Sequence, residues 1–290
     1  MNDFHPGERA LQARAGVAER MAAVGPRFLR DFMPEQHREL FGKLPFMLLG
    51  AVDGQGRPWA TLLAGPPGFV STPDAATLRF AASLPEWDPL AHALQAGTPV
   101  GLLGIELATR RRNRANGVVR SLGPAQLVVD VRQSFGNCPK YIVEREPLWQ
   151  GPAQAAAVER FGPSLPMAAR EQVQAADTFF IATASPPGLQ DGGADVSHRG
   201  GARGFVAVAE HAGRTVLRVP DYVGNSFFNT FGNIALNPRA GLLFADFAAG
   251  DVLQLTGRAE VLWDAQDRLL CFAPEAGVLA RGGLAVRTAA

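Results

Sequence analysis

Short apolar runs separated by turn residues dominate the chain. In the first part these runs are PFMLLGAV (45–52), WATLLAG (59–65), GFVS (68–71), TLRFAA (77–82) and VGLLGIEL (100–107). Later runs of the same kind are FFIATAS (179–185), RGFVAVAE (203–210), TVLRVP (215–220) and AGLLFADF (240–247). Runs of four to eight residues bounded by Gly, Pro or Asp are typical of β-strands joined by hairpins. The pattern therefore predicts a mainly β protein with minor α structure.

A few stretches carry helical signals instead. The predicted helical regions are residues 8–44, 87–97, 167–175 and 225–238. In the second of these, Asp88 is placed to cap the helix, Pro89 suits its first turn, and Gly97 ends it. A further helix start is predicted after Asn137, with Pro139 in its first turn.

The second half of the chain repeats the first. In order, residues 68–70 match 204–206, 78–80 match 217–219, 101–103 match 241–243, and 116–117 match 256–257. The offset between matched residues grows only from 136 to 140, which indicates short loop insertions within one shared architecture. Each copy is predicted to hold six strands and one helix, and even turn spacing favours closure into a barrel over an open sheet.

The predicted organisation is thus two tandem six-stranded β-barrels with added helical segments. Its boundaries are an N-terminal helical segment at 1–44, a first barrel at 45–150, a linker helix at 151–176 and a second barrel at 177–290.

Composition narrows the classes of partner. Of the 290 residues, 47% are hydrophobic and the formal net charge is +1, so no overall field attracts nucleic acid or an anionic membrane. No apolar run reaches the roughly 20 residues that span a bilayer, and no secretory signal is expected. The two cysteines, Cys138 and Cys271, lack metal-type spacing, which favours a reducing, cytoplasmic setting.

Several motifs together resemble the pyridoxamine 5′-phosphate oxidase superfamily. In the second copy these are Asn237-Pro238-Arg239 after a helix, residues 257–260 (GRAE) at a strand end, and the upstream segment SHRGGARGFV. The segments QSFGNCPKYI (133–142) and FHPGE (4–8) are similar to motifs of the branch with two barrels in one chain.

The resemblance implies split β-barrels that bind FMN at the interface between two barrels. In members with one barrel that interface is a homodimer, so a tandem chain is expected to form a pseudo-dimer by itself, with or without further homodimerisation. A small-molecule substrate is the expected partner.

The chain also departs from the oxidase pattern. The phosphate turn, residues 224–228 (GNSFF), lacks the Arg-Lys pair of the oxidase, and Val252 stands about where the oxidase has a flavin-contacting Gln. The C-terminal GGLAVRTAA has no counterpart of the Arg and His that hold pyridoxal in the oxidase. The vitamin B6 reaction is therefore not expected here.

Two segments of the second barrel are the predicted phosphate and flavin contacts. In the first, Ser197, His198, Arg199 and Arg203 lie among glycines, and the forked arginine side chains suit phosphate oxygens. In the second, at a strand-to-helix turn, the candidates are Asp221, Asn225, Ser226 and Asn229. The alternatives are a solvated loop for the first segment and simple helix capping for the second.

The first barrel is expected to contribute across the interface. Arg112 belongs to a basic run, 110–114, in which alternate residues share one face of a strand, and it is the favoured contact. Lys140 and Tyr141 are expected to face the flavin of the second barrel. The basic run alternatively forms a solvated strand edge, which deters pairing with other chains.

The resulting hypothesis is an FMN-dependent oxidoreductase that acts on an unidentified small molecule, with no catalytic side chain assigned. A non-catalytic flavin carrier or sensor is one alternative. A haem-binding split barrel is another and would need an axial histidine, either His198 or His211 in the second barrel. A deazaflavin also remains open. The unequal motifs favour one composite site per chain over two equivalent ones.

Overall fold

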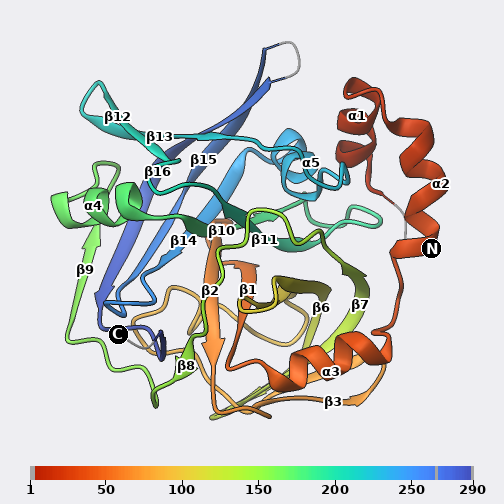
Figure 1. Ribbon diagram of the computed structural model, residues 1–290, viewed down its shortest axis with the longest axis horizontal. Helices are drawn as coiled ribbons and strands as arrows, with labels where there is room; N and C mark the ends of the chain where they lie inside the picture. The colour runs from red at the N-terminus through yellow and green to blue at the C-terminus, as the bar shows by residue number, and fades with distance from the viewer. Residues whose placement is uncertain (1–3, 265–266, 289–290) are drawn as a thin grey trace.

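The computed structural model describes residues 4–264 and 267–288. This part of the chain is mainly β, as predicted, with five α-helices and two large antiparallel sheets. In Figure 1 the first sheet lies in the lower part of the molecule and the second in the upper part. None of the described helices is both long and apolar enough to cross a membrane.

The two sheets share one strand order. The first, β2-β1-β5-β6-β7-β4-β3, contains β1 (Phe46–Val52), β2 (Pro58–Ala64), β3 (Val70–Asp74), β4 (Thr77–Phe80), β5 (Pro99–Glu106), β6 (Arg111–Gly123) and β7 (Gln126–Gly136). The second, β11-β10-β14-β15-β16-β13-β12, contains β10 (Thr178–Ala184), β11 (Ala194–Gly200), β12 (Ala207–His211), β13 (Arg214–Pro220), β14 (Arg239–Ala245), β15 (Val252–Asp264) and β16 (Asp267–Arg281). Also, β9 (Ala157–Phe161) pairs with β16, and β8 (Leu148–Trp149) with β17 (Val286–Arg287).

Each shared order has seven strands rather than the expected six. The sequence pattern missed β7 and β16, the last long strand of each half, and it assigned β11 to a glycine-rich loop. Residues 194–200 pair along their whole length with β10, with His198 opposite Phe180 and Arg199 opposite Phe179. The glycines of this segment therefore follow a regular strand instead of forming a flexible loop.

The internal repeat is confirmed at the level of single glycines. The register of β6 with β7 shifts between Asn116 and Gly117, and that of β15 with β16 shifts between Thr256 and Gly257. A Cβ on either glycine would lie 2.1 Å from a carbonyl oxygen of the facing strand. Both halves therefore carry a β-bulge at the same place, which only glycine tolerates without a shift of the backbone.

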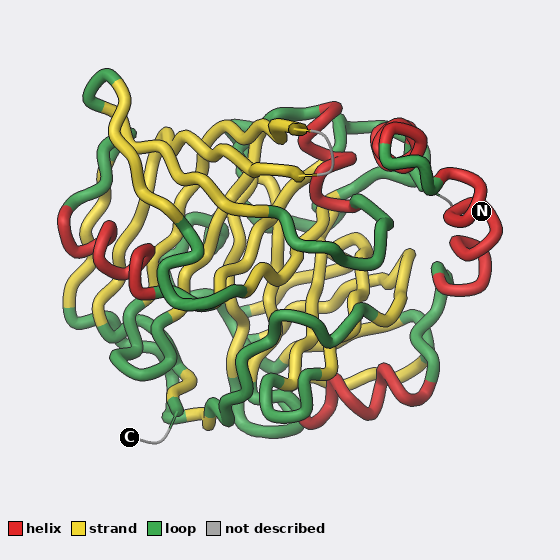
Figure 2. Tube along the Cα trace, turned by 45° about the horizontal axis from the view of Figure 1, so that its top comes forward, coloured by secondary structure: helices red, strands yellow, loops and turns green. Residues whose placement is uncertain are grey.

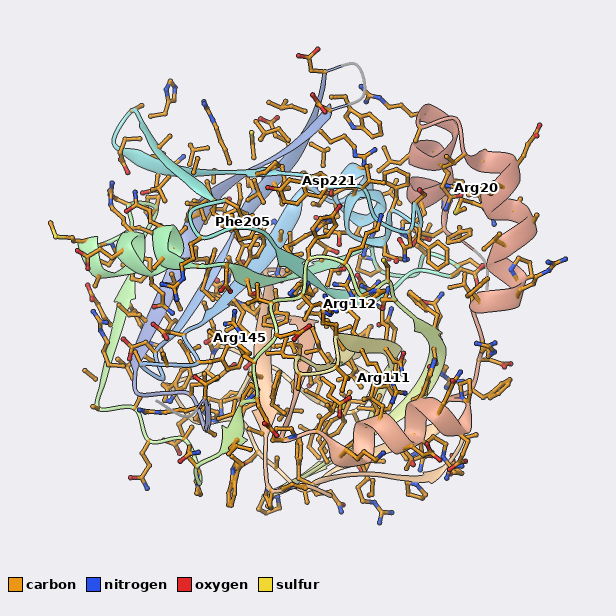
Figure 3. All side chains as sticks on the ribbon, in the orientation of Figure 1. Arg20, Arg111, Arg112, Arg145, Phe205 and Asp221 are labelled. Carbon is orange, nitrogen blue, oxygen red and sulfur yellow. The ribbon has the colours of Figure 1, made fainter. Side chains whose placement is uncertain are left out.

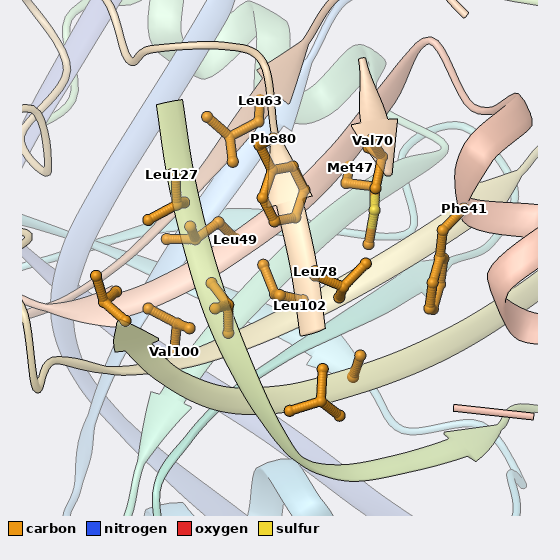
Figure 4. Packing of buried hydrophobic residues seen from close by; sticks show 14 of the residues in the cluster. Phe41, Met47, Leu49, Leu63, Val70, Leu78, Phe80, Val100, Leu102 and Leu127 are labelled. Atoms are coloured by element: carbon orange, nitrogen blue, oxygen red, sulfur yellow. The ribbon is translucent and has the colours of Figure 1, made fainter. Parts of the chain in front are cut away.

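Each sheet curls around its own apolar core. Side chains from all seven strands of the first sheet meet in one cluster, with Met47, Leu78 and Phe80 among those drawn in Figure 4. Phe179, Leu242 and Phe272 belong to the matching cluster of the second sheet. All seven strands of the first sheet, and all but β11 of the second, contribute to the cluster, so each sheet wraps around it as barrel closure predicts.

A third apolar cluster lies between the two sheets. Phe46 and Leu48 of β1 belong to it, whereas the alternating Met47 and Leu49 face the first core. Strand β1 is consequently buried on both faces, which explains its unbroken apolar sequence. Phe180 of β10 packs in the same cluster from the other side.

The contact between the sheets is reciprocal. Strand β5 of the first half contacts β11 of the second, and β14 of the second contacts β2 of the first. A Cβ on Gly101 would lie 2.5 Å from the Cα of Asp195, and one on the matched Gly241 would lie 2.6 Å from the Cα of Trp59. Equivalent glycines thus allow equivalent close approaches in both directions.

The helices cover the ends of the sheets, as the tube in Figure 2 shows. The region 8–44 contains α1 (Pro6–Arg14), α2 (Ala18–Phe28) and α3 (Glu35–Lys43). Helix α4 (Met167–Ala175) has the predicted bounds, and α5 (Asn229–Leu236) lies within the predicted 225–238. Helix α1 packs against α5, where Gly7 and Gly232 allow the two backbones to approach closely.

Two helix predictions were wrong. Residues 87–97 form consecutive turns, because the Asp88 side chain accepts hydrogen bonds from Leu90, Thr61 and Gln254 and ties the segment to two strands. The segment after Asn137 is also not helical. The Asn137 amide donates to the Arg112 carbonyl, and Tyr141 adopts a left-handed conformation with φ of 65°, which a helix start does not permit.

Candidate functional site

A cavity of about 370 Å³ lies where the two halves meet. The first half contributes Leu103 of β5 and Arg112 and Arg114 of β6, and the second half contributes Ser197, His198 and Arg199 of β11. Most of the remaining wall comes from residues 221–226, the start of α5, and Asp267 and Arg268, and the others are Ala15, Val17, Asn137 and Cys138. Four arginines line this space, which we call the arginine cavity. Eight of the eleven residues predicted from the sequence line it, from segments far apart in the chain.

Arg112 is the least neutralised of the four arginines. Its Nε donates to the Cys138 carbonyl at 2.8 Å, and its Nη1 faces His198 Nδ1 at 2.9 Å. Within the described part of the chain it forms no ion pair. Burial, with Arg114 and Arg199 nearby, lowers the pKa of Arg112 to about 10. Figure 3 shows Arg112 between the two sheets, with Asp221 above it.

His198 is a neutral side chain in this wall. An arginine N–H faces its Nδ1, so this nitrogen accepts and the ring proton lies on Nε2. Burial, followed by Arg112 and Arg199, holds the pKa of His198 well below its usual range. The Nε2 atom is buried without a hydrogen-bond partner, which leaves one donor for a ligand.

Asp221 joins two of the arginines. Its carboxylate oxygens each lie 2.6 Å from one guanidinium, Oδ1 from Arg199 and Oδ2 from Arg268. Arg199 also lies over the ring of Phe231, and Arg268 over that of Phe228. The carboxylate of Asp221 neutralises only one of the two guanidinium groups. The three side chains together therefore keep one positive charge.

Arg114 is buried, and both of its terminal nitrogens have partners. It pairs with Asp195 at 2.9 Å and donates to Asn229 at 2.9 Å and to Ser197 at 2.7 Å. Asn229 in turn donates to the carboxyl group of Glu8 in helix α1. Ser197 and Asn229 therefore hold a cation from the other half of the chain.

The start of helix α5 has no side-chain cap. Phe228, at the N-cap position, has a φ of 62°, and Ser226 has a φ of 64°. The predicted capping side chains bond elsewhere, since Asn225 accepts from the Phe227 amide and Ser226 accepts from Arg20. Left-handed residues of this kind are strained and concentrate at binding sites. An uncapped helix N-terminus also favours an anion.

Three predicted residues do not line the cavity. Tyr141 reaches the second half at the rim, where its hydroxyl donates to the Val223 carbonyl at 3.2 Å and its ring stacks on Tyr222 at 5.1 Å. Lys140 is exposed beside it. Arg203 lies in an exposed turn after β11.

The sequence predictions omitted Arg114, Asp195 and Arg268. Arg114 was detectable, because it shares a strand face with Arg112 at a spacing of two residues. Asp195 and Arg268 carried no local signal, since β11 was assigned to a loop and β16 was not recognised. Cys138 lines the cavity as well.

A second cavity, of about 290 Å³, occupies the matching place on the other side of the interface, and we call it the counterpart cavity. Val252, five residues before the bulge at Gly257, stands where Arg112 stands before Gly117. Leu62 takes the place of His198. No arginine is among its described lining residues. Nor do any three or more His, Cys, Asp or Glu side chains of the described chain group as metal ligands would.

Solved structures of other proteins resemble parts of the chain. A Clostridium acetobutylicum protein related to general stress protein 26 of B. subtilis is 17% identical, covering 40% of this chain and 87% of its own, with a TM-score of 0.29. An FAD-binding protein from Mesorhizobium loti is 14% identical, covering 42% and 98%, with a TM-score of 0.29. The haem storage protein HutZ from Vibrio cholerae is 13% identical, covering 42% and 97%, with a TM-score of 0.27. No curated protein matches.

A family comparison covers most of the sequence. The sequence model described as pyridoxamine 5′-phosphate oxidase matches twice, over residues 33–158 and again over residues 165–273. The first match contains the whole first sheet, and the second contains most of the second sheet. The chain therefore belongs to the pyridoxamine 5′-phosphate oxidase family, with two copies of the family's unit in tandem.

Proposed function

We propose that the arginine cavity binds FMN and that the protein is a flavin-dependent oxidoreductase for a small organic molecule. One observation carries the proposal. Arg112 is a largely buried cation with only neutral partners, and it lies in the same cavity as an uncapped helix N-terminus. A phosphate group is the anion that such a pair of features favours.

The residues present fit a flavin phosphate. Four arginines and two aspartates, Asp221 and Asp267, line the cavity. The lining therefore carries a net positive charge, which attracts an anion. The lowered pKa of Arg112 shows that burial disfavours its charge, and a bound phosphate would remove that cost. His198 Nε2 and Arg199 Nε are buried donors that lack partners. The site can therefore compensate an anion with both charge and hydrogen bonds.

The protein's own residues would bind and orient the cofactor. Arg112 and the start of α5 would hold the phosphate, and His198 would donate one neutral hydrogen bond. The network around Arg114 fixes Ser197 and Asn229 and so keeps the two halves in register. When bound, the flavin itself supplies the capacity to accept hydride from a donor.

A haem ligated by His198 fits this geometry poorly. Ligation through Nε2 would move the ring proton to Nδ1, where it would face an N–H of Arg112 at 2.9 Å. His211, the other candidate, lies exposed at the end of β12, away from the cavity. A flavin carrier without turnover uses the same binding residues and is distinguished from an enzyme by activity alone.

The binding proposal is tested with Arg112→Ala and the neighbouring Arg111→Ala. Arg111 is exposed and donates to the Gln36 carbonyl of α3, away from the cavity (Figure 3). Losing a charged contact to phosphate costs about 2–3 kcal/mol, so Arg112→Ala is expected to weaken FMN binding roughly 30- to 150-fold. Riboflavin, which lacks the phosphate, should bind Arg112→Ala and the wild type alike.

Fluorescence titration with FMN and riboflavin measures these affinities. An Arg112→Ala protein that kept the preference for FMN over riboflavin would place the phosphate elsewhere. The absorbance spectrum of the purified protein is the companion measurement, because flavin absorbs at about 450 nm. A Soret band in its place would contradict the assignment. Reduction of the bound flavin by an amine or nicotinamide donor would then separate an enzyme from a carrier.

A further inference from the structure

A larger cavity, of about 590 Å³, adjoins the arginine cavity, and Asn229 lines both. Its walls include His5 and Glu8 at the start of α1, Asn233 of α5 and Asn116 of β6. Loop 185–193, between β10 and β11, closes one side. We call this space the Glu8 cavity. Helix α1 lies before residue 33, where the family match begins, so that match does not cover it.

Two of the segments that line this cavity differ from the matching segments of the first half. Strands β1 and β2 are joined by the short turn 53–57, whereas β10 and β11 are joined by the longer, Pro- and Gly-rich 185–193. Helix α1 packs on α5, and the first half has turns at 87–97 in place of α5. The Glu8 cavity thus lies between strands of the repeated unit and segments, helix α1 and loop 185–193, that differ between the two halves.

Glu8 is a buried carboxyl group without a cationic partner. It accepts from the His5 backbone N–H at 2.8 Å and from Asn229, and its side chain is only 6% exposed. Among the described residues, its only ion-pair contact is with His5 Nε2, at 3.7 Å. Burial lowers the pKa of His5, which therefore stays neutral at pH 7. Burial also raises the pKa of Glu8 to about 8.

Two buried acceptors in the same wall lack partners. Asn233 donates from Nδ2 to Thr183, and its Oδ1 receives no hydrogen bond. Asn116 likewise uses only its Nδ2, toward Asp195 and Gln133, and leaves its Oδ1 open. Asn233 is 3% exposed, so water does not compensate this oxygen freely. Besides the carboxyl groups of Glu8, Asp191 and Asp195, the wall therefore holds two amide oxygens that lack a donor.

The adjacent His5 adds no competing acceptor. Its Nδ1 accepts from the Gly7 amide at 3.2 Å, so the ring proton lies on Nε2. The Asn233 side chain interacts with the His5 ring and opposes part of the pKa lowering caused by burial, but neither His5 Nε2 nor Asn233 Oδ1 has a partner at full hydrogen-bond geometry. Both of these side chains remain available to a molecule that enters between them.

We propose that the Glu8 cavity binds an organic ammonium ion, a small amine with an apolar body. The ammonium group has three N–H donors, which match the Glu8 carboxyl and the open oxygens of Asn233 and Asn116. The body would lie against Val118 and Leu189, which line the same space. The proposal is independent of flavin binding in the neighbouring arginine cavity.

Binding of the cation couples to the proton on Glu8. Among the described residues, the charged groups around Glu8 and His5 are Asp195 and Asp191 of the second half, Arg114 and Arg132 of the first half, and Arg9 of α1. Arg114 is already held by Asp195. With a pKa of about 8, Glu8 is mostly protonated at pH 7, so an arriving ammonium ion displaces close to one proton.

Calorimetric titration with benzylamine and benzyl alcohol tests the proposal. Both probes carry the same ring, but only benzylamine carries a charge at pH 7. We expect saturable binding of benzylamine, at least about tenfold tighter than benzyl alcohol. Titrations in two buffers of different ionisation enthalpy should report release of nearly one proton per amine. Equal affinity for the two probes, or binding without proton release, would overturn the proposal.

Three variants locate the site. Glu8→Gln should weaken benzylamine binding at least about tenfold, whereas Glu35→Gln, an exposed glutamate of α3, should change it less than about twofold. Val118→Trp fills the cavity without altering the carboxyl group and should also block binding, which guards against a folding defect in Glu8→Gln. Arg112→Ala should keep benzylamine binding whatever its effect on FMN. Unchanged binding in both Glu8→Gln and Val118→Trp would sink the assignment.

Discussion

The arginine cavity and the counterpart cavity occupy matching places in one repeated framework, yet they offer opposite chemistry. Arg112 and His198 line the first, and Val252 and Leu62 stand at the same positions of the second. The strand order, the bulge glycines and the reciprocal contacts are the same on both sides. The framework therefore fixes where a cavity forms, and a few side chains decide whether it attracts an anion.

The polar groups beneath the two cavities repeat the same design in charged and neutral forms. Arg114 of β6 crosses the interface to Asn229, and the matching Gln254 of β15 crosses to Asp88 at 2.9 Å. Arg114 needs Asp195 as a counter-ion, whereas burial raises the pKa of Asp88 and favours its neutral form beside Gln254. Duplication has thus kept the cross-interface contact and changed its charge.

The largest expected effect separates these two aspartates. Asp195→Asn leaves the buried Arg114 without a counter-ion, which should lower the free energy of unfolding by about 3–5 kcal/mol. Asp88 pairs with no cation among the described residues, so Asp88→Asn strands no buried charge and should cost only about 0.5–1.5 kcal/mol. Urea unfolding of the two variants measures both values. Equal losses would mean that the two networks do not differ in charge.

Next in size is the close approach between the halves. Gly101→Ala and Gly241→Ala each place a methyl group within 2.6 Å of backbone in the other half, so each should lose about 2–3 kcal/mol. Gly54→Ala is the matched control, because its Cβ would meet no atom within 4 Å. Thermal unfolding of the three variants reports the differences. If only one of the first two were destabilised, the interface would not be symmetric.

The pH dependence of the free energy of unfolding tests the role of Glu8, which has no counterpart in the first half. The pKa of Glu8 in the folded chain is about 8, above the ordinary value of 4.5. Between these two pH values the folded chain binds one more proton than the unfolded chain, so its free energy of unfolding falls as the pH rises. The pKa values of His5, His37 and His198 are all lowered, so their effects fall below pH 6.5.

Of these four groups, only Glu8 therefore changes the free energy of unfolding between pH 6.5 and pH 8. The wild type should lose about 2 kcal/mol more than Glu8→Gln across this window. Urea unfolding at the two ends of the window gives the difference. A wild type that gained stability relative to Glu8→Gln would show that Glu8 is ionised in the folded chain.

The smallest expected effects concern residues that the sequence placed at the flavin. Lys140→Ala and Arg203→Ala remove exposed side chains outside the arginine cavity, and each should change FMN affinity by less than about 0.5 kcal/mol. Tyr141→Phe removes one hydroxyl contact with Val223 at the rim and should cost at most about 1 kcal/mol. A loss of FMN binding in Lys140→Ala as large as that predicted for Arg112→Ala would extend the site beyond the cavity.

Local patterns predicted the features that depend on neighbours in the sequence. The bounds of α4, the apolar strands β1 and β10 and the repeated glycines were all readable, because strand alternation and turn residues act within a few positions. The same local view failed at 87–97, where Asp88 bonds to strands far away in the chain. It also failed at β11, whose glycines resemble a loop until the pairing with β10 is known.

The sequence by itself determined that the chain carries two copies of one unit and that they are unequal, with the phosphate-type residues in the second copy. Only the tertiary structure decided which cation is left unneutralised. Arg199, one of the two arginines predicted to contact the phosphate in the second copy, pairs with Asp221, whereas Arg112 of the first copy has neutral partners. The reason is physical: pairing of buried charges depends on distances across an interface between segments that are far apart in sequence.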